Sequence, residues 1–361
     1  AEILGSGVDV SVEFQVEVKN VGSQYAGKEV VQVYYEAPQG KLGKPARELG
    51  AFAKTEVLQP GETQVLTLQL PVATMASYDD SGVTGYKSCY VLEPGLYKFY
   101  VGGDVRAAQQ VSLQGQEGME ISECMVTEVL EEALAPAEKF QRLCPGPKKE
   151  DGTYEPKAED VPVQTISLEE RIRERMPEAM EITGNQGISF QDVRDKKASL
   201  EAFVAQLSER ELAILVRGEG MCNPLVTPGT ASAFGGTAPS LYAYGIPPVC
   251  TADGPSGIRM DSGLKATQMP IGTMLAASWN LPLVEELYEW EGQELLRNEI
   301  DTLLGPGINL HRNPLNGRNF EYFSEDPYLA SEMAGAHIKG VQSKNIGTSI
   351  KHFAANNQEY R

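Results

Sequence analysis

The chain has 361 residues, of which 41% are hydrophobic, and it carries a formal net charge of −19. This length predicts two or three domains, with enough apolar residues to form real hydrophobic cores. The acidic balance argues against nucleic acid or an anionic membrane as a partner, because both are recognised by basic surfaces. We therefore expect a neutral or weakly polar small ligand.

The cysteines and the apolar runs narrow the class of protein further. Five cysteines without C-x-x-C spacing predict ordinary buried thiols rather than a disulfide framework. No run approaches the ~18 apolar residues of a membrane span, and no signal peptide is visible. A cytoplasmic location is favoured over secretion, while a leader upstream of residue 1 stays open. The cysteines are Cys89, Cys124, Cys144, Cys222 and Cys250.

The N-terminal third has the period-two pattern of half-buried strands. Residues 8–18 alternate strictly between apolar and polar side chains, and turn signals such as Pro60-Gly61 and Pro94-Gly95 separate the later runs. Short strands without helical periodicity predict a β-sandwich at residues 1–115. The further predicted strands are 30–35, 65–70 and 96–101.

Residues 116–187 predict a connector, because the strand pattern gives way there to Pro, Gly, Glu and Lys. We expect this segment to be irregular and to lie as a strap along a neighbouring domain. Short helices are expected only at 125–134 and 168–175. No charged cluster in the sandwich is typical of a catalytic site.

Residues 188–361 alternate between strand and helix signals, which predicts an α/β domain with parallel strands. Ser208 to Glu211 form a capping box, and Asn280 suits a helix N-cap. A complete (β/α)8 barrel takes about 250 residues, so we expect only part of a TIM-type barrel here. The predicted elements are a helix at 199–207, a loop at 218–236, a strand at 248–252, a helix from about 280, a strand at 302–304, a helix at 328–343 and a strand at 349–353.

Charged residues follow each of the three apolar strand runs in this domain. Loops after parallel barrel strands converge on one face, so residues distant in the sequence should meet there. Charged groups hydrogen-bond more strongly than neutral ones, which suits a ligand rich in hydroxyl groups. The candidate site residues are Asp253, Arg259, Arg318, Lys351 and His352.

Four long motifs in this domain resemble those of glycoside hydrolase family 3, the β-glucosidase group. They are TADGPSGIR at 251–259, GPGINLHR at 305–312, GRNFEYFSEDP at 317–327 and KHFAANNQE at 351–359. Residues 1–115 are similar to the fibronectin type III-like domain of that family through EVVQVY at 29–34, LQPGE at 58–62 and PGLY at 94–97. This domain order resembles the minority of members in which the fibronectin-like module precedes the barrel.

The resemblance implies a retaining β-glucosidase that hydrolyses terminal β-D-glucosyl residues of cello-oligosaccharides or aryl glucosides without a cofactor or metal. It makes Asp253 an acceptor for sugar hydroxyls, and Arg259, Arg318, Lys351 and His352 donors or pocket-shaping groups. Family members use an Asp nucleophile and a separate Glu acid/base. Neither is found here, so both are expected outside residues 1–361, in a second chain or a continuation. A homo-oligomer is possible.

Other interpretations stay open at this point. Asp253 could be turn chemistry, and Arg259 or Arg318 could form salt bridges at the barrel rim. An acidic cluster of Glu321, Glu325 and Asp326 is interpreted as loop structure and as a partner for nearby Arg rather than as a catalytic pair. The alternatives to a β-glucosidase are a non-catalytic carbohydrate-binding relative and a β-xylosidase of the same family.

Overall fold

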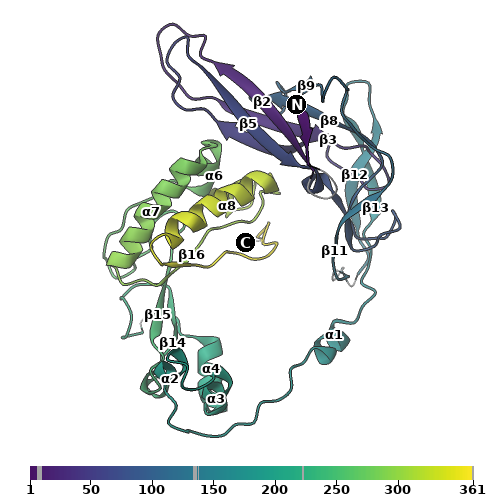
Figure 1. Ribbon diagram of the computed structural model, residues 1–361. Helices are drawn as coiled ribbons and strands as arrows, with labels where there is room; N and C mark the ends of the chain where they lie inside the picture. Colours follow the sequence, from purple (N-terminus) through teal and green to yellow (C-terminus); the bar gives the residue numbers. More distant parts are fainter. Residues whose placement is uncertain (6–9, 133–135, 137, 222, 360–361) are drawn as a thin grey trace. The chain divides into compact units, whose positions relative to one another are not determined.

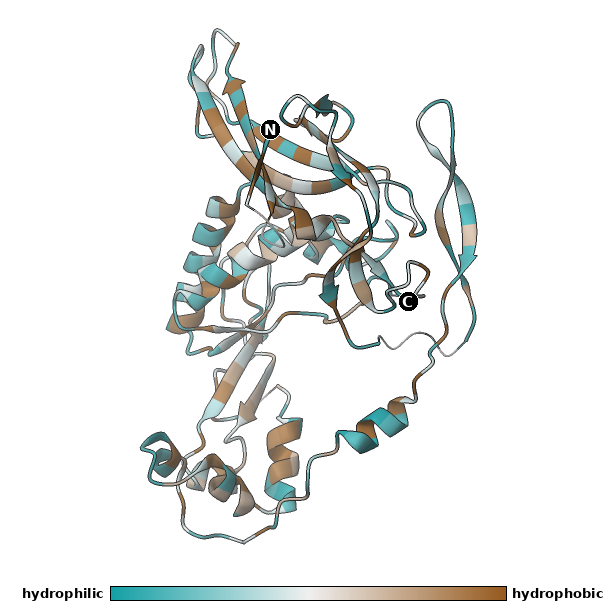
Figure 2. Ribbon diagram, turned by 45° about the vertical axis from the view of Figure 1, so that its right-hand side comes forward, coloured by the Kyte–Doolittle hydropathy of each residue, from teal (hydrophilic) through white to brown (hydrophobic). Residues whose placement is uncertain are grey.

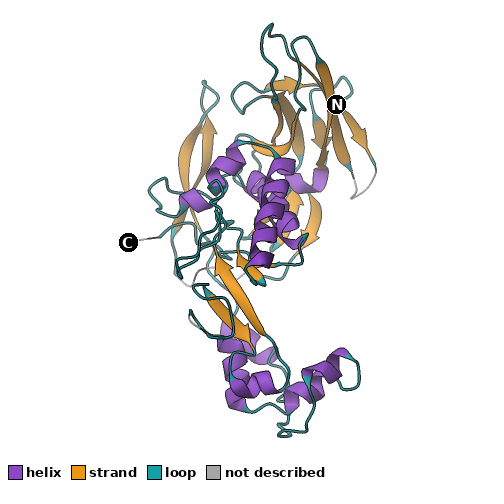
Figure 3. Cartoon of the chain, turned by 90° about the vertical axis from the view of Figure 1, so that its left-hand side faces the viewer, coloured by secondary structure: helices purple, strands orange, loops and turns teal. Residues whose placement is uncertain are grey.

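A computed structural model describes residues 1–5, 10–132, 136, 138–221 and 223–359. The chain forms two compact units, Ala1–Pro177 and Glu178–Arg361. Strands are the main regular elements of the first unit, and helices alternate with strands in the second (Figure 3). Among the described residues, no helix combines the length and apolar character needed to cross a membrane.

The first unit contains a β-sandwich of two antiparallel sheets. One sheet has the strand order β1-β2-β5, and the other has the order β10-β8-β3-β4 with β9 beside β8. Three further strands form the sheet β11-β7-β6, and β12 pairs with β13. The bounds are β1 Glu2–Leu4, β2 Ser11–Lys19, β3 Val30–Glu36, β4 Glu48–Lys54, β5 Thr63–Pro71, the 3-10 helix η1 Val72–Met75, β6 Ser77–Asp79, β7 Cys89–Leu92, β8 Gly95–Gly102, β9 Gln109–Val111, β10 Met119–Ile121, β11 Met125–Val129, β12 Gln141–Lys148, β13 Tyr154–Asp160 and α1 Leu168–Glu174.

The alternating pattern of the sequence places one face of each sandwich strand in the core. Val12 and Phe14 of β2 are buried, and the ring of Phe14 meets Phe99 of the facing sheet edge-on at 5.6 Å between centroids. Bands of alternating hydropathy along the long strands reflect this arrangement (Figure 2). The strands predicted at 30–35, 65–70 and 96–101 are confirmed, as is the 8–18 strand from Ser11 onward; residues 8 and 9 lie outside the described part.

Strand β4 was not predicted from the sequence. Its sequence, ELGAFAK, contains Gly and Ala, which are poor strand formers. A Cβ atom on Gly50 would lie 2.8 Å from Leu70 Cδ1, so glycine allows close approach to the opposite sheet. The packing of the sandwich, rather than local preference, therefore makes this segment a strand.

The connector region is more ordered than predicted. The helix expected at 125–134 is wrong over Met125–Val129, which is strand β11 and pairs with β7; residues 133 and 134 are outside the described part. The helix expected at 168–175 is confirmed as α1, whose N-cap Ser167 accepts from the Glu170 N–H. Residues 116–177 of this region belong to the first unit.

A hairpin occupies the Pro-rich centre of that region, where irregular chain was expected. Strand β12 contains Pro145 and Pro147 and pairs with β13 through a register shift between Pro145 and Lys148. A two-stranded ribbon has two free edges, so prolines can be accommodated without the loss of a ladder hydrogen bond. The prediction of irregular chain from the Pro content alone was therefore wrong.

The second unit is an α/β unit around a four-stranded sheet of order β14-β15-β16-β17. Strands β15, β16 and β17 are parallel, and β14 is antiparallel to β15. Helices α7 and α8 follow β15 and β16 and pack side by side (Figure 1). The bounds are α2 Phe190–Arg194, α3 Leu200–Ala205, α4 Glu209–Arg217, β14 Ser232–Gly235, α5 Pro239–Ala243, β15 Pro248–Asp253, α6 Gly272–Ala277, α7 Leu281–Arg297, β16 Thr302–Leu304, the 3-10 helix η2 Asn319–Glu321, α8 Pro327–Gln342 and β17 Gly347–Thr348.

Local signals identified most of these elements. The Ser208 capping box at α4 and the Asn280 N-cap of α7 are both confirmed. The helix predicted at 199–207 is α3; Phe203 and Leu207 are buried, but Leu200, expected on the same face, is exposed. The elements predicted at 248–252, 302–304 and 328–343 are confirmed as β15, β16 and α8.

Two predictions in the second unit are wrong. The loop expected at 218–236 contains strand β14, whose Gly-rich end hid the strand signal. The strand expected at 349–353 is formed earlier, at Gly347–Thr348, and Phe353 is 81% exposed. Past β17, the Ser349 N–H donates to the Leu303 carbonyl oxygen at 2.9 Å, and Lys351 forms a parallel bridge with Gly307.

The thiols are free, and two of the four described ones are buried. Cys89 and Cys250 are buried, as predicted, whereas Cys124 and Cys144 are half-buried. Cys222 lies outside the described residues.

Candidate functional site

All five candidate residues line one pocket of about 400 Å3 in the second unit. This volume lies within the range of small-molecule sites. The pocket lies where β15 ends at Asp253 and β16 ends at Leu304, and Ser349 just beyond β17 contributes to its wall. The convergence expected from parallel strand topology is thus present, whereas the roles of the five residues stay predictions.

The turn after β15 depends on glycine. Gly254 has a φ of 133°, and a Cβ atom there would lie 2.1 Å from the carbonyl oxygen of Gly257. Gly257 has a φ of 109°, and its Cβ atom would lie 2.4 Å from the Thr267 carbonyl oxygen. The Arg259 N–H donates to the Asp253 carbonyl oxygen at 2.8 Å and closes the turn. Only glycine fits this backbone at both positions.

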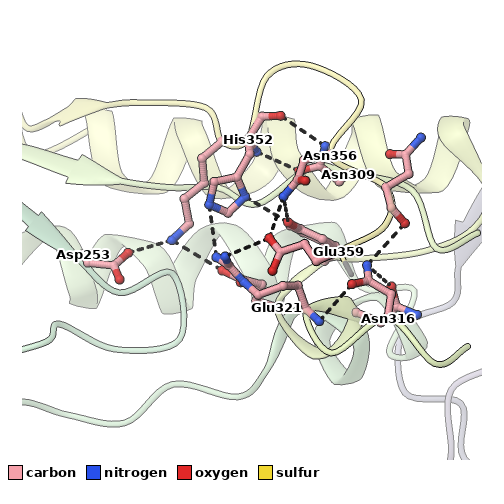
Figure 4. A network of polar contacts seen from close by, with 12 residues as sticks. Asp253, Asn309, Asn316, Glu321, His352, Asn356 and Glu359 are labelled. Atoms are coloured by element: carbon pink, nitrogen blue, oxygen red, sulfur yellow. Dashed lines mark hydrogen bonds and ion pairs between the residues drawn. The ribbon is translucent and has the colours of Figure 1, made fainter. Parts of the chain in front are cut away.

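Lys351 joins two carboxylates at the floor of the pocket. Its Nζ donates to Asp253 Oδ1 at 2.6 Å and lies 3.4 Å from Glu321 Oε2. The Lys351 side chain is 14% exposed and that of Asp253 is 35% exposed, so Asp253 faces the pocket while Lys351 lies deeper. Figure 4 shows Asp253, Glu321 and His352 within one connected polar network.

Arg318 connects the acidic loop to the histidine. Its guanidinium donates to Glu321, to Glu359 Oε1 at 3.2 Å and to His352 Nε2 at 3.1 Å. The hydrogen bond to Glu321 is the main cause that raises the pKa of Arg318. The interpretation of Glu321 as a partner for a nearby Arg is confirmed. Asp326 accepts from Leu329 N at 2.8 Å as the N-cap of α8.

His352 is held as a neutral tautomer. Arginine can only donate, so His352 Nε2 must accept, and Nδ1–H then donates to Tyr322 Oη at 2.9 Å. Burial, followed by the charges of Arg318 and Lys351, lowers the pKa of His352. Asn309 fixes the backbone of this residue, since its Oδ1 accepts from His352 N at 2.7 Å and its Nδ2 donates to the His352 carbonyl oxygen at 3.2 Å.

Two family models match this chain. The model described as the glycosyl hydrolase family 3 N terminal domain matches residues 204–359, and the fibronectin type III-like domain matches residues 29–105. Residues 204–359 are a family 3 glycosyl hydrolase domain. The predicted fold class, a fibronectin type III-like β-sandwich followed by part of a TIM-type α/β barrel, is confirmed.

Relatives of the chain resemble both domains together. A β-glucosidase from Ruminococcus albus is 48% identical over 98% of this chain, and β-glucosidase A from Butyrivibrio fibrisolvens is 39% identical over 95% of it. The solved structure of a β-glucosidase from Paenibacillus barengoltzii matches 99% of the chain with 64% identity and a TM-score of 0.95. The chain spans 36%, 42% and 38% of the lengths of these three proteins.

Arg259 occupies a different position in the family 3 pocket from the other candidates. Its side chain is 64% exposed and pairs with Asp261, with Nη2 3.0 Å from Oδ2. Hydrogen bonding to Asp261 raises the pKa of Arg259. Asp261 lines the pocket as well, so an exposed ion pair marks this part of the wall.

Several partners of the candidate residues were not singled out from the sequence. Tyr322, Asn309, Asn356 and Glu359 lie within the motifs that carry the family resemblance, but each is a residue type with many roles. Asn356 Nδ2 donates to Glu359 Oε1 at 2.9 Å and so extends the network around Arg318. Within the described ranges, no group of three or more His, Cys, Asp or Glu residues is arranged to hold a metal ion.

Proposed function

We propose that this chain is part of a retaining β-glucosidase and that its pocket binds the terminal, non-reducing glucosyl residue of the substrate. The observation that carries the proposal is the gathering of Asp253, Arg259, Arg318, Lys351 and His352 around one cavity of about 400 Å3. A pyranose presents a ring of hydroxyl groups, each of which can donate and accept. Charged partners on opposite walls suit such a ligand better than an apolar pocket would.

The acidic and basic side chains of the pocket have complementary roles as acceptors and donors for sugar hydroxyls. Asp253 contacts Lys351 through Oδ1, which leaves its other oxygen to accept from a sugar hydroxyl. Arg259 supplies N–H donors from the more exposed wall. His352, held neutral by Arg318 and Tyr322, keeps a fixed ring orientation beside the sugar without adding charge.

The chemical step requires groups beyond the five named here. In double displacement, a carboxylate attacks the anomeric carbon while an acid protonates the departing glycosidic oxygen, and water then releases the sugar. We propose that the nucleophile Asp and the acid/base Glu belong to the remainder of the same enzyme, as a continuation or a second chain. The relatives named as β-glucosidases, which are longer than this chain, support that view.

The sugar specificity is open to one competing interpretation within the family. An exo-α-(1->6)-L-arabinopyranosidase from Bifidobacterium longum is 46% identical over 130 residues. Proteins named for a different pyranoside therefore share much of this region, and a β-xylosidase remains the second candidate. Glucose differs from xylose by its hydroxymethyl group, so comparison of the two sugars tests this point directly. A non-catalytic sugar-binding relative is the third candidate.

The test is calorimetric titration of the 361-residue chain with glucose and xylose. Asp253→Asn should weaken glucose binding at least about tenfold, because a charged hydrogen bond to a buried partner is lost. Asp195→Asn is the matched control: Asp195 is exposed, pairs with Lys197 and lies outside the pocket. Equal affinity of Asp253→Asn and wild type would contradict the site assignment. When the chain is joined to the proposed remaining domains, loss of aryl β-glucoside hydrolysis by Asp253→Asn should accompany the loss of binding.

We also propose that the protein is located in a reducing compartment, the cytoplasm. Free thiols at the four described cysteines support it.

A further inference from the structure

Helix α7 packs against the loop that carries Asp253 and Arg259 into the pocket. Tyr288 Oη donates to the Pro255 carbonyl oxygen at 2.6 Å, and Glu294 Oε1 accepts from Thr267 N at 3.0 Å. Glu291 lies between these two contacts on the helix, three residues from each. Positions three residues apart share a helix face. One face of α7 therefore contacts the loop at both ends and presents Glu291 between them.

Glu291 is a buried carboxyl group that forms no ion pair with any described residue. It is 2% exposed, and neither of its oxygens has a hydrogen-bond partner among the residues that the structure describes. The hydroxyl of Ser256, in the turn that follows Asp253, is also buried and unpartnered in this part of the chain. An unpaired, buried carboxylate is strongly unfavourable, so the group is neutral. Burial, with a further contribution from the charge of Glu294, raises the pKa of Glu291 to about 8.

A neutral carboxyl group offers one donor and one acceptor to the turn opposite. The Gly257 N–H of that turn makes no hydrogen bond to Glu291, but it acts to lower the pKa of Glu291, less strongly than burial raises it; Ser256, the residue before it, supplies the unpartnered hydroxyl. Gly257 tolerates no Cβ atom, and its N–H donates to the Gly254 carbonyl oxygen at 3.1 Å. A shift at Gly257 therefore moves a tight turn that begins at Asp253.

We propose that Glu291 is a positioning residue for the pocket: in its neutral form it holds the 254–257 turn and so sets the places of Asp253 and Arg259. The inference rests on the proposed function, because it concerns the same sugar site. Once ionised, the carboxylate needs water or a cation, and the turn must open to provide it. Affinity for the sugar then falls on the alkaline side.

Other titratable groups surround Glu291, and the test must separate them from it. Glu294 and Tyr288 belong to the same helix, and His337 of α8 stacks on Tyr288 at 3.5 Å between ring centroids. Lys344 contacts the neighbouring Gly292, but its Nζ pairs with Glu289 Oε2 at 3.0 Å. Asp253 and Arg259 are joined across the turn by the hydrogen bond from the Arg259 N–H to the Asp253 carbonyl oxygen.

The experiment follows the 361-residue chain from about pH 6 to about pH 9.5 with two measurements. Carboxyl 13C NMR follows ionisation of Glu291 and amide NMR follows Gly254 and Gly257, while calorimetry measures glucose affinity. We expect the Glu291 carboxyl to titrate near pH 8, and the two amide signals and the affinity to change with the same midpoint. Glucose affinity should fall about tenfold, the loss expected when one charged hydrogen bond to the sugar is misplaced.

Glu291→Gln supplies the decisive comparison, because the amide keeps a donor and an acceptor but does not ionise in this range. It should bind glucose like wild type at pH 6 and lose the alkaline transition in both the amide signals and the affinity. Glu289→Gln is the matched control, since Glu289 is 43% exposed on the same helix, and it should keep the transition. Glu291→Met, which preserves volume without hydrogen bonding, should fold but bind more weakly at pH 6.

The outcomes separate this inference from the proposed function. A Glu291 carboxyl already ionised at pH 6, unmoved Gly254 and Gly257 amides, or an alkaline transition that persists in Glu291→Gln would overturn the inference even if glucose binds well. Absence of glucose binding at every pH, with coupled carboxyl and amide titrations, would instead refute the sugar site and leave the positioning of the turn supported.

Discussion

Replacement of His337 should remove an acid-sensitive contribution to the stability of the second unit. The ring is fully buried on α8, stacks on Tyr288 at 3.5 Å, and has no hydrogen-bond partner for either nitrogen within the described part of the chain. Burial lowers the pKa of His337 to about 3. The imidazole is therefore neutral in the folded protein and must stay neutral for this packing to persist.

The sign of the effect follows from proton binding. The folded pKa lies below the ordinary value of 6.5, so the unfolded chain binds more protons at acidic pH. The contribution of His337 to stability is therefore complete above pH 6.5 and is lost as the pH falls toward about 3. At about 1.4 kcal/mol per pH unit, a fall from about pH 7 to about pH 4.5 costs about 2.5 kcal/mol.

Guanidinium unfolding followed by tryptophan fluorescence measures this effect, because Trp279 and Trp290, the two tryptophans of the chain, belong to the second unit. His337→Phe and His337→Leu differ in volume, so their stabilities at pH 7 should differ through packing. Relative to wild type, however, both should gain about 2.5 kcal/mol between pH 7 and pH 4.5. Unfolding free energies that fall in parallel with wild type in both variants would refute the argument.

Two further predictions concern other buried ionisable groups. Lys44→Met should destabilise the first unit by about 3–5 kcal/mol in unfolding followed by far-UV circular dichroism, because Glu93, which is 4% exposed, loses its cation. Adding Glu93→Gln should restore much of this loss. Equal stabilities of the single and double variants would contradict the prediction. Between about pH 6 and about pH 9, the Glu291→Gln variant should gain about 2.5 kcal/mol of unfolding free energy relative to wild type, measured by tryptophan fluorescence. The raised pKa of Glu291 makes the wild type lose stability as the pH rises through about 8. A difference in stability between variant and wild type that stays the same at both pH values would argue against a buried neutral acid.

The sandwich strands were predictable where one face is apolar and the other polar. Strand β2 follows this rule, and its alternation reports burial directly. Strand β4 could not be found in the same way, because Gly50 is selected by the closeness of Leu70 rather than by strand preference. Strand β12 was missed because of its prolines. Proline has no N–H, so its cost in a strand depends on whether a neighbouring strand would accept a hydrogen bond at that position. The sequence alone does not reveal this.

The sequence was enough to predict which residues meet in the candidate site, because parallel strands bring together the loops that follow them. Asp253 and Lys351 are 98 residues apart and yet form a 2.6 Å contact. The tautomer of His352 was beyond the sequence, since it depends on Arg318 and Tyr322 reaching opposite ring nitrogens. Glu291 was also missed as a candidate, because a glutamate within an amphipathic helix is normally an exposed residue.

His337 and Glu291 together give the second unit a defined pH range of stability. Of these two groups, only His337 lowers stability as acid is added below pH 4.5, the ordinary value for Glu, and only Glu291 lowers it as base is added above pH 6.5. Between these values the two slopes have opposite signs and similar size, so their sum is nearly flat. Burial, followed by the charges of Arg318 and Lys351, also lowers the pKa of His352 and so favours its neutral form. The two buried groups His337 and Glu291 therefore favour folding most under neutral to mildly acidic conditions, in which both are uncharged in the folded chain.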